Sequence, residues 1–136
     1  MDQIYPDDGL LYLLRQMLGT GGWNYDLFVN NYTPTLDDVI GDYTLAAWSG
    51  YAQINVPTAS FTFSQVAAHL GSLQAPNIVF TNGTGSPVSV YGYVIRDSTN
   101  TYIVASARFD GAPIVIPAGG NQLVTPILGD FSGLSS

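Results

Sequence analysis

The segment VYGYVIRD, residues 90–97, decides how this chain must fold. It reads as a β-strand, and successive side chains of a strand point to opposite faces. One face would carry Val90, Gly92 and Val94, and the other would carry Tyr91, Tyr93 and Ile95. Burying an aromatic or large aliphatic side chain stabilises the fold by about 2–3 kcal/mol, so leaving either face exposed to water would be costly. Both faces of this strand therefore need a cover.

The chain around this segment predicts a mainly β protein. Short strands separated by turn residues are expected from about residue 24 to residue 128. They comprise residues 25–30, 48–56, 61–63, 77–81, 87–96, 101–109, 113–116 and 122–128. This spacing is typical of a small antiparallel sandwich or jelly-roll-like barrel. The carboxyl-terminal half reads as an antiparallel meander.

An amphipathic helix is predicted ahead of the strands, at about residues 7–18. Its apolar residues recur at helical spacing and are Leu10, Leu13, Leu14, Met17 and Leu18. Asp7 can cap its first turn, and Gly19 can adopt the left-handed conformation that closes a helix. The apolar stripe is expected to complete the core; the alternative is an arm that docks on a neighbouring molecule.

Two shorter segments allow a turn of helix. Residues 35–41, TLDDVIG, begin with a capping threonine, carry an acid three residues later and end in glycine. One helical turn is therefore expected there. Residues 64–70 fit a helical turn or a strand about equally well.

Composition predicts a single domain, residues 1–136, and narrows the class of partner. The chain has no cysteine, so disulfides and thiolate metal sites are excluded. It has a net charge of −7, with three arginines and no lysine. Binding to nucleic acid or to an anionic membrane needs clustered cations, so neither partner is expected.

The amino-terminal apolar run is interrupted by Arg15 and Gln16, and predicts neither a secretion signal nor a membrane span.

No catalytic residue is predicted, and the protein is expected not to be an enzyme. His69 is the only histidine, and no acid follows it at the spacing of a zinc-binding helix. The sequence also has no G-x-S-x-G motif, which would mark a serine nucleophile. A satisfied or exposed structural histidine is the simpler interpretation.

Clustered aspartates raise the possibility of a calcium site, because Ca²⁺ prefers carboxylate oxygens. They are Asp7, Asp8, Asp37, Asp38 and Asp42. The pairs Asp7-Asp8 and Asp37-Asp38 both lie where a predicted helix or helical turn begins, and helix capping explains them without an ion. The sequence therefore predicts no metal and no cofactor.

The aromatic residues point to an interface instead. The chain contains nine tyrosines, six phenylalanines and two tryptophans but few charges, and aromatic residues are enriched in interface cores. Candidate interface residues are Tyr91, Tyr93 and Ile95, with Tyr102 on the neighbouring strand. Two covers for this face remain open: a second sheet or the helix of the same chain, or another protein chain.

Four segments carry a resemblance to a known group of proteins: LFVNNYTPT (27–35), SGYAQINV (49–56), VYGYVI (90–95) and ARF (107–109). With them the chain resembles small virion structural proteins of tailed bacteriophages, most of all head decoration, or cement, proteins. The resemblance implies a protein without a catalytic site, located on the capsid exterior of the virion. It also implies binding to the major capsid protein, and self-association as a homotrimer.

Three other functions remain open. A tail or baseplate component of the phage particle would share the β domain and the oligomeric habit. A carbohydrate-binding β-sandwich module would present a planar row of exposed aromatic rings. An enzyme would require a pocket that holds His69 within hydrogen-bonding reach of an aspartate and a serine.

Overall fold

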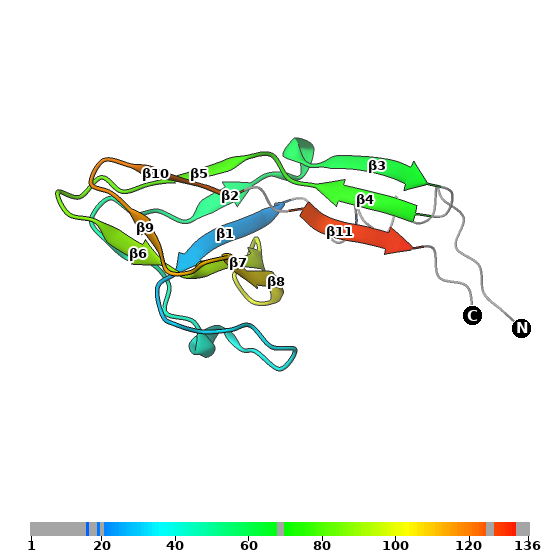
Figure 1. Cartoon of the computed structure of the whole chain (residues 1–136). Coiled ribbons are helices and arrows are strands. Elements are labelled where there is room, and N and C mark those ends of the chain that lie inside the picture. Colours follow the sequence, from blue (N-terminus) through cyan, green and yellow to red (C-terminus); the bar gives the residue numbers. More distant parts are fainter. Residues whose placement is uncertain (1–15, 17–18, 20, 68–69, 125–126, 133–136) are drawn as a thin grey trace, which may run out of the picture.

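The computed structural model describes residues 16, 19, 21–67, 70–124 and 127–132 (Figure 1). Apart from Gln16, the helix predicted at about residues 7–18 lies outside the described residues. The described part is mainly β, as predicted, and consists of antiparallel sheets that do not close into a barrel. Most strands form two facing layers, and a sheet of three strands projects from one end of them. The fold is thus a small sandwich-like one.

Eleven strands and two short 3₁₀ turns make up the described residues. The strands are β1 (Trp23–Phe28), β2 (Ile54–Val56), β3 (Thr62–Ala67), β4 (Leu70–Gln74), β5 (Ile78–Thr81), β6 (Val88–Val90), β7 (Gly92–Asp97), β8 (Ile103–Arg108), β9 (Ile114–Ile116), β10 (Asn121–Val124) and β11 (Ile127–Ser132). The turns are η1 (Ile40–Asp42) and η2 (Thr58–Ser60).

The second half of the chain forms one long antiparallel ribbon. Strand β7 pairs with β8, β6 with β9, β5 with β10, and β4 with β11. Only β7 and β8 are consecutive in this series, so the predicted meander is wrong. In a meander each strand pairs with the next, whereas these pairs are nested around the turn after Asp97.

The first half of the chain attaches to this ribbon at two places. Strand β1 pairs with β7, and β2 lies on the other edge of β1, giving the sheet order β2-β1-β7-β8. Strand β3 pairs with β4, giving the order β11-β4-β3 in the projecting sheet. Residues 64–70 are therefore strand rather than helix, except for the two residues not described.

The strand predicted at residues 87–96 is interrupted at Tyr91, where the chain passes from one sheet to another. Strand β6 pairs with β9, but β7 pairs with β1 and β8. The Tyr91 amide donates to the Phe28 carbonyl (2.9 Å), and the Phe109 amide donates to the Tyr91 carbonyl (2.8 Å). This break changes which side chains share a face. Tyr93 packs against the main core between the two layers. Tyr91 and Val94 belong to a second, smaller apolar cluster on the opposite face of the sheet.

The two faces of β1 and β7 are both covered within the chain. Alternate residues of β1, Trp23, Tyr25 and Leu27, face the main core between the layers. Phe28 and Val94 face the opposite way, and Tyr43 from the loop after β1 covers them. Intramolecular packing therefore accounts for the apolar segment at residues 90–97.

Two other sequence expectations differ from the structure. Of the strand predicted at residues 48–56, only Ile54–Val56 pairs with β1. Residues 35–41 form no α-helix; the helical turn there is the 3₁₀ turn η1, whose first turn is closed by the Asp42 carboxylate accepting the Val39 amide (2.9 Å).

Replacing Tyr25 by phenylalanine should raise the free energy of unfolding by about 1 kcal/mol. The Tyr25 hydroxyl is completely buried and has no hydrogen-bond partner, and a buried unsatisfied polar group costs about 1–3 kcal/mol. Tyr51→Phe is the matched control, because that hydroxyl accepts the Leu27 amide and donates to Asp26. Its loss should lower stability by about 1–3 kcal/mol. Urea unfolding measures both, and a Tyr25→Phe protein less stable than wild type would contradict the assignment.

Candidate interaction surface

A loop of residues 30–44 leaves the end of β1 and lies beneath the sheet (Figure 1). Its neck is closed by Asn30, whose amide group donates to the Asp42 carbonyl (2.9 Å) and accepts the Thr44 amide (2.8 Å). The Val29 amide donates to the Thr44 carbonyl beside it (2.8 Å). Loops closed at the neck in this way are compact and often functional. We call this segment the 30–44 loop.

The carboxylate of Asp38 organises the interior of the 30–44 loop. It accepts four hydrogen bonds: from the Tyr32 and Tyr43 hydroxyls, from the Thr35 hydroxyl (2.6 Å) and from the Thr35 amide (2.9 Å). Desolvation opposes ionisation of this carboxyl, but the hydrogen bonds from Thr35, Tyr32 and Tyr43 outweigh it and lower the pKa of Asp38 below its ordinary value. For Tyr43, desolvation and the hydrogen bond to Asp38 raise the pKa to about 12.

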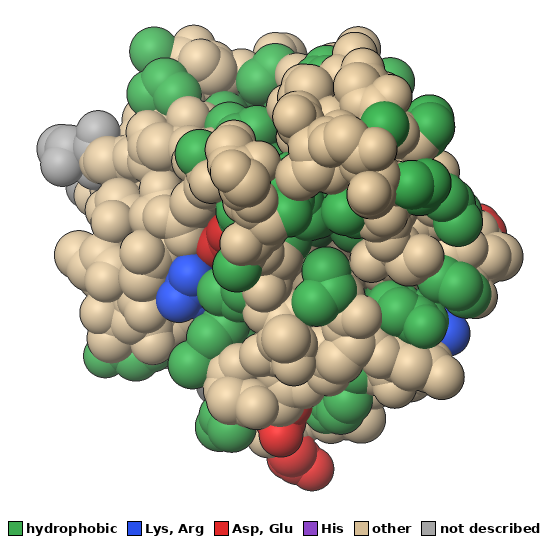
Figure 2. All heavy atoms as spheres, turned by 90° about the vertical axis from the view of Figure 1, so that its left-hand side faces the viewer, with side chains coloured by type: hydrophobic (Ala, Val, Ile, Leu, Met, Phe, Trp, Pro, Cys, Tyr) green, Lys and Arg blue, Asp and Glu red, His purple; other side chains and the backbone are tan. Residues whose placement is uncertain are grey.

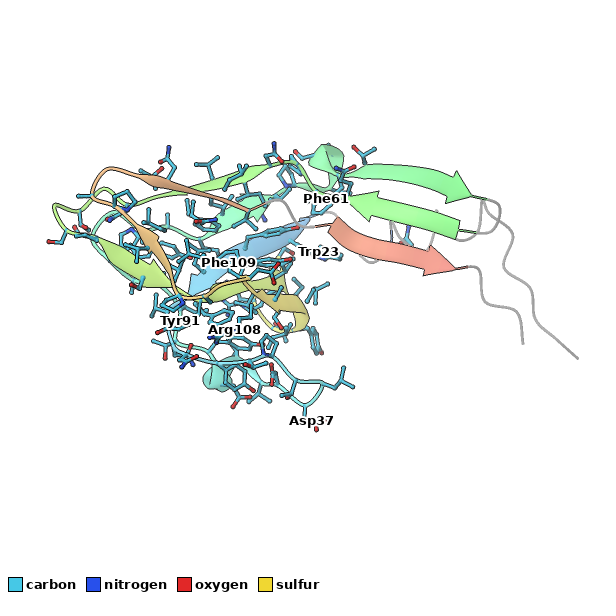
Figure 3. The ribbon with its side chains drawn as sticks, in the orientation of Figure 1. Trp23, Asp37, Phe61, Tyr91, Arg108 and Phe109 are labelled. Carbon is cyan, nitrogen blue, oxygen red and sulfur yellow. The ribbon has the colours of Figure 1, made fainter. Side chains whose placement is uncertain are left out.

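The 30–44 loop is clamped to β8. The hydroxyls of Tyr43 and Ser106 are hydrogen-bonded at 2.8 Å, and Arg108 donates to the Tyr32 carbonyl at 3.0 Å. The Arg108 guanidinium also lies over the Tyr91 ring, 5.3 Å from its centroid. Figure 3 shows Arg108 and Tyr91 where the loop meets the sheet, and Asp37 at the far tip of the loop. The loop is thus a fixed extension of the sandwich.

Apolar side chains point outward from this clamped loop. Leu36 is fully exposed, Val39 is 63% exposed, and Ile40 is 37% exposed. Tyr102, which precedes β8, is 72% exposed. We call these four residues the loop patch. Exposed apolar groups gathered in one place mark interaction sites more often than scattered ones do.

Two hollows join the members of the loop patch. One, of about 460 Å³, lies between residues 34–38 and residues 103–106, and Leu36 lines it. The other, of about 390 Å³, is lined by Val39, Ile40 and Tyr102. Asp38 and Ile103 belong to both hollows. Through these two shared residues the hollows connect all four residues of the loop patch.

The four residues expected at an interface lie in different environments. Ile95 is completely buried, and Tyr93 is half-buried against Phe109, with ring centroids 6.0 Å apart. Tyr91 is half-buried beneath Arg108. Tyr93 and Ile95 thus belong to the main core, and only Tyr102 lies on the loop patch. Leu36, Val39 and Ile40 were not anticipated, because apolar residues in a predicted helical turn normally face the core.

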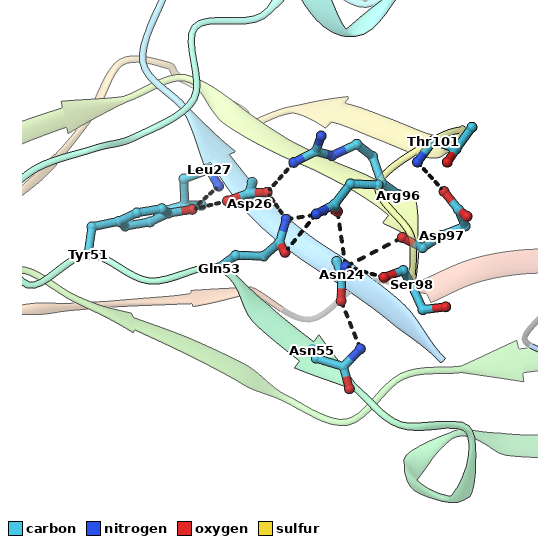
Figure 4. A network of polar contacts seen from close by, with 11 residues as sticks. Asn24, Asp26, Leu27, Tyr51, Gln53, Asn55, Arg96, Asp97, Ser98 and Thr101 are labelled. Atoms are coloured by element: carbon cyan, nitrogen blue, oxygen red, sulfur yellow. Dashed lines mark hydrogen bonds and ion pairs between the residues drawn. The ribbon is translucent and has the colours of Figure 1, made fainter. Parts of the chain in front are cut away.

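A second polar cluster lies on β1 and β7 (Figure 4). Asp26 is buried, and its carboxylate forms an ion pair with Arg96 at 3.0 Å. It also accepts hydrogen bonds from Tyr51 (2.8 Å) and from the Gln53 amide group (2.6 Å). The Tyr51 hydroxyl in turn accepts the Leu27 amide (2.9 Å), where the chain between residues 46 and 54 leaves the edge of β1. All these contacts are internal, so this cluster fixes the fold.

Neighbouring amides extend the Asp26 cluster toward the turn after β7. The Asn24 side-chain amide donates to the carbonyls of Asp97 (3.4 Å) and Ser98 (3.2 Å), and to the Asn100 side chain (3.0 Å). Asn55 donates to the Asn24 side-chain oxygen (2.7 Å). These bonds tie β1, β2 and the β7–β8 turn together. The turn that starts the ribbon is therefore fixed by the first half of the chain.

Charged groups are sparse on the molecular surface. Figure 2 views one end of the molecule, and apolar and uncharged polar atoms make up nearly all of that face. Among the described residues, no three histidine, aspartate or glutamate side chains lie close enough to share a metal ion. His69 lies outside the described residues.

Comparison with known proteins adds no relative. No protein-family model matches the sequence, and no curated protein or solved structure matches it. In the described part of the chain, no helix has the length and apolar character needed to cross a membrane.

Replacing Asp38 by asparagine should loosen the 30–44 loop, because an amide cannot accept from four donors. The amides of residues 33–42 should exchange with solvent faster than in the wild type, as measured by hydrogen–deuterium exchange. Thr99→Ala is a control at another exposed turn, and it should leave exchange in the loop unchanged. Equal exchange in the Asp38→Asn loop would contradict the role of this carboxylate.

The same carboxylate predicts a pH dependence with a definite sign. The pKa of Asp38 is lower in the folded chain than the unfolded value of about 4. The stability that the Asp38 carboxylate contributes to the folded state is therefore complete above pH 4. The contribution decreases only as the pH falls below 4 toward the folded pKa. An NMR titration of the Asp38 carboxyl carbon should therefore show its midpoint below pH 4, and a midpoint above 4 would contradict the hydrogen bonding.

Proposed function

We propose that the protein is a non-enzymatic structural component of a phage particle, a decoration or cement protein that binds the outer surface of the capsid. The loop patch carries this proposal: it presents exposed apolar groups on a loop that the sandwich holds in place. The sequence resemblance to phage virion proteins supplies the identity of the partner, the major capsid protein.

A clamped apolar surface suits a permanent structural contact. Binding costs less when the contacting groups are already ordered, and hydrogen bonds through Asp38 and Ser106 order the 30–44 loop before any partner arrives. A protein that binds only the assembled lattice stabilises that lattice by mass action. Because a shell repeats its binding site many times, moderate affinity at each site is sufficient.

Self-association as a homotrimer is part of the same proposal and rests on the resemblance. Tyr93 and Ile95 are covered within the chain, so a trimer contact has to use other residues. The purified protein should sediment as a trimer, and a monomer at micromolar concentration would remove this part of the proposal without affecting capsid binding.

Two alternatives use the observed surface differently. A tail or baseplate component would dock through the same loop patch, and only its position in the particle would differ. A carbohydrate-binding module needs several exposed rings in a row to stack on sugars. Among the large exposed apolar residues of the described chain, Tyr102 is the one aromatic, which favours a protein partner over a sugar.

Replacing Leu36 and Tyr102 together by serine should weaken binding to capsids that lack the protein by at least about thirty-fold. This is the change expected from losing about 2 kcal/mol at an interface hot spot. Both side chains are exposed, so the fold should be unaffected. Co-sedimentation with empty capsids, at increasing protein concentration, measures the affinity.

The matched control is the double replacement of Val79 and Leu123 by serine. These residues form an exposed cross-strand pair on β5 and β10, away from the 30–44 loop. The control should bind like wild type. Wild-type protein that does not bind capsids would refute the proposed function, and equal loss in both double variants would exclude the loop patch as the binding surface.

A further inference from the structure

The outer edge of β8 is a second unusual feature beside the loop patch. The sheet order β2-β1-β7-β8 places β8 at the end of the sheet. Strand β7 pairs with its inner edge, and no strand of the described chain pairs with its outer edge. From Ile103 to Ala107 this strand has no charge and no proline. Proteins normally protect such edges with charged residues, prolines or bulges, because an open edge pairs with other chains. The bulge of β8 lies near its start, and the following residues are regular.

A groove lies between β8 and the 30–44 loop. The hollow of about 460 Å³ has residues 103–106 of β8 on one side and residues 34–38 of the 30–44 loop on the other. The Tyr43–Ser106 hydrogen bond fixes the two sides relative to each other. The groove is therefore bordered by a sheet edge, which can pair with a backbone, and by a loop that can contact side chains.

The 30–44 loop, which borders the groove, is negatively charged. Asp38 lines the groove, Asp37 and Asp42 belong to the same loop, and the loop has no lysine or arginine. Arg108, at the far end of β8, is already engaged by the Tyr32 carbonyl and the Tyr91 ring. A second copy of this chain in the groove would bring the same loop carboxylates against each other, so local charge disfavours a copy of the chain as the occupant of this groove.

We propose that this groove binds an extended segment of the partner protein, which adds as a strand to β8 and places a basic side chain against the carboxylates of the 30–44 loop. Main-chain hydrogen bonds supply affinity in strand addition, and pockets for alternate side chains supply specificity. Here the apolar side chains of the segment contact Leu36 and Tyr102. The identity of the partner rests on the proposed function. The extended shape and basic charge of the bound segment are inferred from the groove itself.

Hydrogen–deuterium exchange of the protein, alone and bound to empty capsids, tests strand addition directly. In the free protein, the β8 amides that point away from β7 should exchange quickly. Bound to capsids, the same amides should exchange at least tenfold more slowly. Binding without such protection would overturn the inference and leave the proposed function standing. Amides already protected in the free protein would also overturn it, because the chain itself would then cover the edge.

A peptide experiment decides the inference if wild-type protein does not bind capsids. The probe is an eight-residue peptide that alternates valine with threonine and has one central arginine. It should slow the same β8 amides, and a peptide with glutamate in place of arginine should have a smaller effect. A version with prolines at one odd and one even position cannot pair along either edge, and should have none. No protection by the arginine peptide would overturn the inference.

The charge contribution is tested by Asp37→Asn. Asp37 is exposed at the tip of the loop and its carboxylate has no role in the fold, so stability should be unchanged. The variant should bind the arginine peptide several-fold more weakly and with less dependence on salt. Asp110→Asn removes the same charge outside the loop and should bind like wild type. Equal binding by all three proteins would exclude the carboxylates as the basis of selectivity.

Discussion

Replacing Asp26 by asparagine is expected to lower the free energy of unfolding by about 3–5 kcal/mol, the usual cost of removing one member of a buried ion pair. Both partners are largely buried: the side chains of Arg96 and Asp26 are 13% and 4% exposed. Asparagine would leave the guanidinium without a counter-charge. The side-chain NH2 group of the new asparagine would also replace one carboxylate oxygen, so the hydrogen bond from Tyr51 or from Gln53 would be lost because two donors would meet.

Guanidinium chloride unfolding measures this loss, and two variants make the result specific. Asp37→Asn removes an exposed carboxylate and should change stability by less than about 0.5 kcal/mol. Replacing Asp26 by asparagine and Arg96 by methionine together removes both charges, and should recover part of the loss because no unpaired charge stays buried. A loss below about 1 kcal/mol in Asp26→Asn would show that the ion pair does not hold the sheet together.

Replacing Phe28 by alanine should lower stability by about 3–5 kcal/mol, as is typical for a buried phenylalanine. The Phe28 side chain is completely buried and contacts the Tyr43 ring edge-on, with centroids 5.1 Å apart. It also packs on Gly92, where an added Cβ would lie 2.6 Å from the ring. Removing the ring leaves a cavity between β7 and the 30–44 loop that a rigid sheet cannot close.

This variant also separates stability from binding. Tyr43 carries the loop through its bonds to Asp38 and Ser106, so losing its ring partner should release the loop and weaken capsid binding at temperatures where the sheet is still folded. Phe28→Leu keeps most of the volume and should cost less than about 1.5 kcal/mol. Thermal unfolding followed by co-sedimentation with capsids measures both effects. Equal losses in the alanine and leucine variants would contradict a packing role.

The sequence predicts strands well where alternation is strong. The strand predicted at residues 25–30 is β1, which begins and ends two residues earlier; Tyr25 and Leu27 lie in the main core, and Val29, just after β1, packs against it. Strand pairing is harder to predict, because nested pairs and a meander share the same local pattern. The break at Tyr91 is also invisible locally: it depends on β6 and β7 finding different partner strands.

The candidate site was predicted less well than the fold. Tyr93 and Ile95 look like a surplus apolar face only while the second layer is unknown, and that layer covers them. Leu36, Val39 and Ile40 look like ordinary core residues until the hydrogen bonds of Asp38 fix the loop with their side chains outward. Exposure depends on which distant segment arrives to cover a residue, and no local pattern contains that information.

The nested ribbon has a consequence for how the chain reaches its native state. Its pairs are separated by increasing lengths of sequence, from Arg96 with Ile103 at the turn to Leu70 with Ser132 at the far end. Closing the last pair first would order a very long loop, at a high cost in chain entropy. Once the turn has closed, each further pair needs only a short additional segment to be ordered. The ribbon can therefore form like a zipper from the β7–β8 turn outward, and the Asn24 side chain, which binds that turn, lies where the zipper begins.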